Sequence, residues 1–203
     1  ASGTNVYLIW KDDGTSSISF AGGLDFVTNV GGGTSFVVIT DLSTSGTAFS
    51  PDLAVSGNNV YAVWQDNDAL IDPNGDILFS SSPDNGVTFT TPPENLSSTS
   101  GSVSTNAKMS ASGSNVYVAW QDNSDGDNDI YFKAIGSYGT DFASVIVPLS
   151  NNAGNSIVPQ IASTGDNVYV TWQDGSPFDI LFKASNNDGS GFGSVTNLSK
   201  TFG

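Results

Sequence analysis

The sequence predicts an all-β protein, a four-bladed β-propeller of about 50-residue, four-stranded antiparallel repeats. Three observations predict it. One phrase ending in tryptophan occurs four times, three other phrases recur between its copies, and the apolar residues in all of them alternate with a period of two. Glycine, asparagine, aspartate and proline separate the apolar segments, as is typical of turns between antiparallel strands.

The tryptophan phrase predicts a strand that is buried on both faces. Its copies are "TNVYLIWKDD", "NNVYAVWQDN", "SNVYVAWQDN" and "DNVYVTWQDG", which contain all four tryptophans. Side chains of a strand alternate, so Val60 and Trp64 point to one face and Tyr61 to the other. Because both faces are apolar, neighbouring sheets must cover them both, as in a propeller.

The three other phrases supply the remaining strands of each unit. The third strand is expected in "SISF" (17–20), "DILF" (76–79), "DIYF" (129–132) and "DILF" (179–182). The fourth is expected in "TDLS" (40–43), "ENLS" (94–97), "VPLS" (147–150) and "TNLS" (196–199). The innermost strand is expected in "SPDLAVSG" (50–57), "NAKMSASG" (106–113) and "VPQIASTG" (158–165).

The phrases divide the chain into four units of one propeller domain spanning residues 1–203. The approximate units are residues 1–49, 50–105, 106–156 and 157–203. The first unit has no innermost phrase before its tryptophan phrase. We therefore expect an irregular first blade that lacks an inner strand.

A turn in the second unit carries a family resemblance. In "SPDNGVTF" (82–89), Ser82, Asp84, Gly86 and Phe89 match the Asp-box pattern S-x-D-x-G-x-T-F. With this motif the chain resembles the sialidase-like, Asp-box (BNR-type) β-propeller repeat proteins. The resemblance implies a turn-stabilising hairpin that is remote from any catalytic centre. The fourth unit keeps Ser185, Gly189 and Phe192, and the third keeps Gly139 and Phe142.

The catalytic residues of that family are missing. The resemblance implies an arginine triad that holds a carboxylated sugar, and a tyrosine nucleophile activated by glutamate. The chain has no arginine, and its one glutamate, Glu94, lies beside a Pro-Pro pair. Lysine cannot reproduce the bidentate geometry of arginine, so sialidase activity is excluded. We expect no catalytic residues and no enzyme, and an aspartate-dependent glycosidase is the third of the functions considered.

The amino-acid composition limits the kinds of molecule that the protein can bind. The five basic residues are all lysines and stand against twenty acidic ones, which gives a net charge of −15. This charge disfavours binding to nucleic acid or to anionic lipid. No apolar run reaches the roughly 20 residues that span a bilayer. The chain begins with alanine, which fits a mature exported protein as well as a piece of a longer one, so we expect an extracellular or cell-surface location.

One acidic loop and two sequons are candidate sites. In "QDNSDGDNDI" (121–130), the side chains of Asp122, Asp125, Asp127 and Asp129 could bind calcium, the one cofactor considered. A pair of solvated β-turns is the alternative that we favour. The triplet "NLS" makes Asn95 and Asn197 candidate glycosylation sites at equivalent places in two units.

The missing inner strand leads to the functional prediction. An unpaired strand edge is a template for a strand of another chain, so other copies of the protein are the predicted partner. Head-to-tail contacts of this kind form filaments. Two alternatives stay open: "KTFG" (200–203) closes the ring, or the chain is part of a longer propeller. We predict a non-catalytic structural or adhesive role at the cell surface, with a lectin-like module that binds glycans as the alternative.

Overall fold

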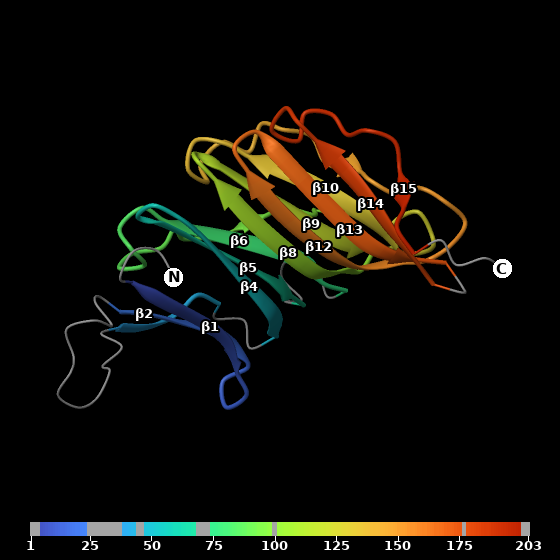
Figure 1. The fold of residues 1–203 in the computed structure, drawn as a ribbon. Coiled ribbons are helices and arrows are strands. Elements are labelled where there is room, and N and C mark those ends of the chain that lie inside the picture. The colour runs from blue at the N-terminus through green and yellow to red at the C-terminus, as the bar shows by residue number, and fades with distance from the viewer. Residues whose placement is uncertain are drawn as a thin grey trace.

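The computed structural model describes residues 5–23, 38–43, 47–67, 74–98, 101–175 and 178–199. These residues form four antiparallel sheets and contain no helix. Three of the sheets have four strands, and one has three. The sheets lie side by side in chain order, so that the first and the last are at opposite ends of the row (Figure 1). The predicted all-β, four-bladed propeller is confirmed.

Each sheet is one blade, and its strands run in chain order from the innermost strand outward. Blade 1 consists of β1 (Val6–Asp12), β2 (Ser17–Gly23) and β3 (Val38–Asp41). Blade 2 consists of β4 (Ala48–Ser56), β5 (Asn59–Asp66), β6 (Asp76–Ser82) and β7 (Glu94–Asn95). Blade 3 consists of β8 (Ser104–Ser112), β9 (Asn115–Asp122), β10 (Asp129–Ile135) and β11 (Val147–Pro148). Blade 4 consists of β12 (Ser156–Thr164), β13 (Asn167–Asp174), β14 (Asp179–Ser185) and β15 (Thr196–Asn197).

Blade 1 has three strands among the described residues, as predicted. Its tryptophan phrase forms β1, whereas the same phrase forms the second strand of each later blade. β1 therefore takes the inner position and packs beside β4 of blade 2. The inner strands β4, β8 and β12 pack beside one another in the same way.

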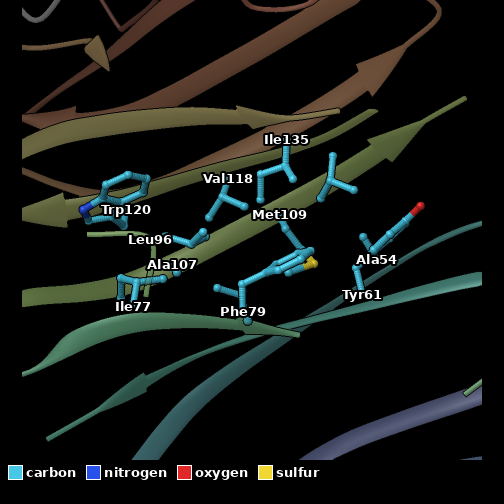
Figure 2. Packing of buried hydrophobic residues seen from close by; sticks show 12 residues of the cluster. Ala54, Tyr61, Ile77, Phe79, Leu96, Ala107, Met109, Val118, Trp120 and Ile135 are labelled. Atoms are coloured by element: carbon cyan, nitrogen blue, oxygen red, sulfur yellow. The ribbon is translucent and has the colours of Figure 1, made fainter. Parts of the chain in front are cut away.

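The hydrophobic core lies between the blades. We call the face of a blade that meets the next blade its forward face, and the opposite one its backward face. Figure 2 shows Tyr61 and Phe79 on the forward face of blade 2, opposite Val118 and Trp120 on the backward face of blade 3. The strand β5 is buried along almost its whole length, as the two apolar faces of its phrase predict.

The two ends of the propeller differ in chemistry. Ala48 at the start of β4, Asp66 at the end of β5 and Asp76 at the start of β6 lie side by side in the sheet. The corresponding residues of blade 3 also pair, so its connection between the second and third strands, residues 123–128 with Asp125 and Asp127, lies at this end. We call it the acidic end. In blades 2, 3 and 4, the connections between the third and fourth strands lie at the opposite end, because neighbouring strands are antiparallel.

Among the residues that the structure describes, no helix has the length and apolar character needed to cross a membrane.

Candidate functional site

The inner strands carry a bulge that was not predicted from the sequence. The register of each shifts between Phe49 and Asp52, between Thr105 and Lys108, and between Ile157 and Gln160. A left-handed backbone accompanies each bulge, with φ of 51° at Ser50, 53° at Asn106 and 55° at Val158. This conformation is unusual for a β-branched residue such as valine. Bulges and strained residues of this kind re-aim side chains and cluster at functional sites.

The residue that follows each bulge differs from blade to blade. Asp52, Lys108 and Gln160 occupy equivalent register positions on β4, β8 and β12. At positions that pack the blades together, the same residue type recurs in each blade, as the tryptophans do. These three positions instead carry side chains of different charge. Asp52 is an acid without a repeated counterpart, and the sequence interpretation missed it. The signal was the variation within the innermost phrases "SPDLAVSG", "NAKMSASG" and "VPQIASTG".

Hydrogen bonds join the bulges across the blades. The Asp52 carboxylate accepts a bond of 2.9 Å from the Met109 backbone N–H of the next blade. The Gln121 carbonyl Oε1 accepts bonds from the Asn106 amide at 2.9 Å and from the Val158 backbone N–H at 3.2 Å. We call Asp52, Asn106, Lys108, Gln121 and Gln160 the axial row, because they lie on or next to the inner strands. This row offers a carboxylate, an ammonium group and amides, the groups that bind a ligand rich in hydroxyls.

The acidic end contains a pair of aspartates in each of blades 2, 3 and 4. The members of a pair face each other across neighbouring strands: Asp66 with Asp76, Asp122 with Asp129, and Asp174 with Asp179. Hydroxyl groups hold them, as the Ser97 hydroxyl holds Asp76 at 2.7 Å and the Ser150 hydroxyl holds Asp129 at 2.9 Å. Because the pairs repeat and are hydrogen-bonded within their blades, we read them as part of the fold.

The predicted calcium ligands are divided between the sheet and the loop. Asp122 and Asp129 are buried in the sheet, and Asp122 accepts a bond of 2.6 Å from the Ser104 hydroxyl. Asp125 accepts a bond of 2.8 Å from the Tyr131 hydroxyl, and burial raises the pKa of Asp129. Within the described ranges, no three His, Cys, Asp or Glu residues, Asp127 included, gather in a group that could hold a metal ion. Calcium binding stays a prediction.

The two sequon asparagines have equivalent structural roles. The Asn95 amide donates to Asp76 at 2.7 Å, and the Asn197 amide donates to Asp179 at 2.8 Å. The Asn95 carbonyl also accepts a bond of 2.9 Å from the Ser98 backbone N–H. Each side chain thus closes its blade at the outermost strand, and its use as a glycosylation site stays a prediction.

The predicted Asp-box residues form a hydrogen-bonded turn at the end opposite the acidic loops. The Ser82 hydroxyl donates to Asp84 at 2.7 Å and accepts from the Gly86 backbone N–H at 2.8 Å. The Thr88 backbone and hydroxyl both donate to Asp84, which lowers the pKa of Asp84 to about 2. Phe89 follows the turn and packs edge-on against Phe20 of blade 1. We call residues 82–89, 135–142 and 185–192 the glycine turns of blades 2, 3 and 4.

Comparison with known proteins gives structural matches only. No protein-family model matches the chain, and no curated protein matches its sequence. "Bacteroides ovatus Xyloglucan PUL GH43B" shares the fold with a TM-score of 0.53 and 11% identity, over 95% of this chain and 39% of that one. The "GH43 Endo-Arabinanase from Bacillus licheniformis" has a TM-score of 0.54 and 8% identity, over 98% and 74%. The α-L-arabinofuranosidase from Lactobacillus brevis has a TM-score of 0.55 and 10% identity, over 97% and 69%.

These matches correct two predictions. They do not test the predicted self-association, which stays a prediction. We expected a non-catalytic structural or adhesive protein, and we expected no enzyme. Both expectations are contradicted, because the solved structures that share the propeller over nearly the whole chain are glycoside hydrolases. The missing arginine excludes sialidase chemistry, but it does not exclude other kinds of glycoside hydrolysis. The chain spans about two fifths of the length of the first of these structures.

Proposed function

We propose that the chain is the propeller of a glycoside hydrolase that acts on polysaccharides containing arabinose or xylose. One observation carries this proposal: the fold is shared, over 95% of the chain or more, with enzymes named for arabinan, arabinofuranoside and xylan. The axial row supports it, because the amide and carboxylate groups of the row suit a hydroxyl-rich ligand.

We assign Asp52 as the carboxylate that acts on the sugar. Glycoside hydrolysis generally needs two carboxyl groups on either side of the bond that breaks. Asp52 lies at the middle of its inner strand, after a bulge, and is half-buried. We place the second carboxyl group in the acidic connection of blade 3, residues 123–128. Amides of the axial row, such as those of Asn106 and Gln160, would hold sugar hydroxyls.

Hydrolysis assays test this proposal. The protein is incubated with arabinan, arabinoxylan and the p-nitrophenyl glycosides of α-L-arabinofuranose and β-D-xylose, and released sugar is measured. We expect turnover, and we expect Asp52→Asn to lower kcat at least about 100-fold, since a positioned acid or base commonly contributes that much. Asp13→Asn is the matched control, because Asp13 is an exposed acid in the β1–β2 turn. Unchanged turnover by a folded Asp52→Asn protein would rule out the assigned residue.

A carbohydrate-binding module is the second candidate. The axial row has one aspartate, whereas its other members are amides and a lysine, and amides recognise sugars without cleaving them. Affinity electrophoresis on gels that contain arabinan or xylan separates the two functions. Retarded migration without sugar release would favour the binding module, and neither retardation nor release would contradict both functions.

We further propose that the glycine turns of blades 2 and 4 are Asp-boxes of the kind found in sialidase-like propellers. Their support is the shared set of bonds, because the Ser185 hydroxyl donates to Asn187 and accepts from Gly189 as Ser82 does with Asp84 and Gly86. We also keep the proposals of one domain over residues 1–203 and of an extracellular location. Shared cores between consecutive blades support the first, and polysaccharide substrates outside the cell would fit the second.

A further inference from the structure

The forward face of every blade carries a stacked pair of aromatic rings. In each pair a tyrosine of the tryptophan phrase stacks on a phenylalanine of the neighbouring strand. The ring centroids are 6.1 Å apart for Tyr7 and Phe20, 6.2 Å for Tyr61 and Phe79, 6.3 Å for Tyr117 and Phe132, and 6.3 Å for Tyr169 and Phe182. The blades therefore offer the same surface to whatever lies in front of them.

In blades 1, 2 and 3, the glycine turn of the next blade covers this pair. The phenylalanine of each turn packs edge-on against the phenylalanine of the pair, with centroid distances of 4.8 Å for Phe89, 5.8 Å for Phe142 and 4.9 Å for Phe192. Glycine is required in the turn, since a Cβ on Gly86 or Gly189 would lie 2.5 Å from the covered ring. Both glycines also have positive φ, at 81° and 77°.

Two of the three contacts include a matched set of hydrogen bonds. The Tyr117 hydroxyl and the Asn115 amide donate to the Asp188 carboxylate, at 2.7 Å and 2.9 Å. The hydroxyl of Tyr7 and the amide of Asn5 donate to the Asn85 carbonyl, both at 3.2 Å. The residue just before the turn glycine is thus recognised by a tyrosine and an asparagine of the preceding blade.

Blade 4 has the same surface, and no turn of the described residues covers it. Tyr169 is 37% exposed, whereas Tyr117 is fully buried at 0%, and Ile180 of the same face is 42% exposed. A hollow of about 460 Å³ opens here, and its walls include Asn167, Tyr169, Ala184 and Phe192. Asn167 and Tyr169 are the equivalents of Asn115 and Tyr117 in the repeated phrase. The groups that recognise a glycine turn are therefore in place around this hollow.

We propose that the forward face of blade 4 is the docking site for the glycine turn of a further propeller blade, one that is not among the four described. The turn has the form S-x-[DN]-[DN]-G-x-x-F. Its amide or carboxylate accepts from Tyr169 and Asn167, its glycine lies over Phe182, and its phenylalanine packs on the edge of that ring. The same interface occurs at the junctions of blades 1 and 2 and of blades 3 and 4, so this site continues a contact that the protein already makes.

A hairpin peptide tests the docking site. The peptide comprises residues 80–91 of the chain, closed by a disulfide between two added terminal cysteines, and is titrated into the isotope-labelled protein while NMR spectra are recorded. We expect saturable shifts at Asn167, Tyr169 and Phe182. A peptide with Gly86→Val is expected to cause none, because the valine would collide with the ring. Tyr169→Phe is expected to weaken binding several-fold, up to about tenfold, and Tyr138→Phe, at an exposed tyrosine elsewhere, leaves it unchanged.

Several results would overturn the proposal. The first is no shift at millimolar peptide, and the second is equal shifts with the valine peptide. Shifts at these residues that grow with protein concentration alone would assign the hollow to a second copy. Shifts caused there by xylo- or arabino-oligosaccharides, in place of the peptide, would make it a sugar site.

Discussion

The junctions between blades 2 and 3 and between blades 3 and 4 are built on the same plan and differ in their hydrogen bonds. At the second junction the Tyr117 hydroxyl donates to Asp188. At the first, Tyr138 stands where Asp188 would be, and the buried Tyr61 hydroxyl has no partner among the described residues. Burial raises the pKa of both tyrosines to about 12. Two blades therefore pack without the bond, which shows that ring packing is the constant part of the junction and polar recognition the variable part.

The largest effect is expected from the turn glycines. Gly189→Val would put a Cβ 2.5 Å from the Phe132 ring in a backbone with φ of 77°, so we expect it to lower the free energy of unfolding by about 3 kcal/mol. In Gly139→Val the new Cβ would lie 3.0 Å from its nearest neighbouring atoms, so the loss of unfolding free energy should be smaller. Gly101→Val is the control, with a positive φ and open space around it, and should cost about 1 kcal/mol. Urea unfolding measures all three, and equal losses would contradict the role of ring contact.

The two tyrosines should respond differently to loss of their hydroxyl groups. Tyr117→Phe leaves Asp188 without its 2.7 Å donor and is expected to cost about 1 to 2 kcal/mol. Tyr61→Phe removes a buried hydroxyl that has no described partner, and is expected to be neutral or slightly stabilising. The comparison is made by urea unfolding of both variants. Similar losses in the two proteins would mean that the hydrogen bond does not distinguish the junctions.

A hydrogen-bond acceptor placed opposite the Tyr61 hydroxyl should stabilise the junction between blades 2 and 3. Tyr138→Asn puts at this position the residue that blade 2 has as Asn85, whose carbonyl accepts from Tyr7. Asparagine also tolerates the φ of 58° at this position better than tyrosine does. We expect a gain of about 1 kcal/mol in the free energy of unfolding. The gain should shrink when Tyr61→Phe is combined with it, because the hydrogen bond is then lost, and an undiminished gain would come from the backbone alone.

The smallest effect is expected on the pH dependence of stability, at the equivalent turn positions where blade 2 has Asp84 and blade 4 has Asn187. The pKa of Asp84 is lowered to about 2, chiefly by the Thr88 hydroxyl and backbone. A lowered pKa in the folded state means that the carboxylate stabilises the fold above about pH 4 and that this contribution is lost as the pH falls from 4 towards 2. Asp84→Asn should therefore flatten the acid part of the stability profile slightly, and Asn187→Asp should steepen it. Thermal melts between pH 2 and pH 7 measure both, and parallel profiles would contradict the assignment.

The sequence interpretation succeeded where neighbours along the chain decide the structure. Alternation within "NVYAVW" predicted burial on both faces of β5, and the absence of an innermost phrase predicted the three strands that the described residues of blade 1 form. It failed at the axial row, because the bulges that place Asp52 depend on pairing between strands. It also failed on function, because the missing arginine and histidine exclude particular reactions and leave others open to a protein rich in aspartate.

The sequence by itself determined the strands, their faces and the turns, since strand periodicity and turn chemistry act over a few residues. Only the tertiary structure decided that each glycine turn reaches back over the aromatic pair of the preceding blade. It alone decided that the bulged inner strands bring Asp52, Asn106 and Gln121 into one axial row. The physical reason is that most of these contacts join residues far apart in the sequence, 57 positions for Asp52 and Met109 and 71 for Tyr117 and Asp188. The packing of whole blades, which no local pattern encodes, sets which of them meet.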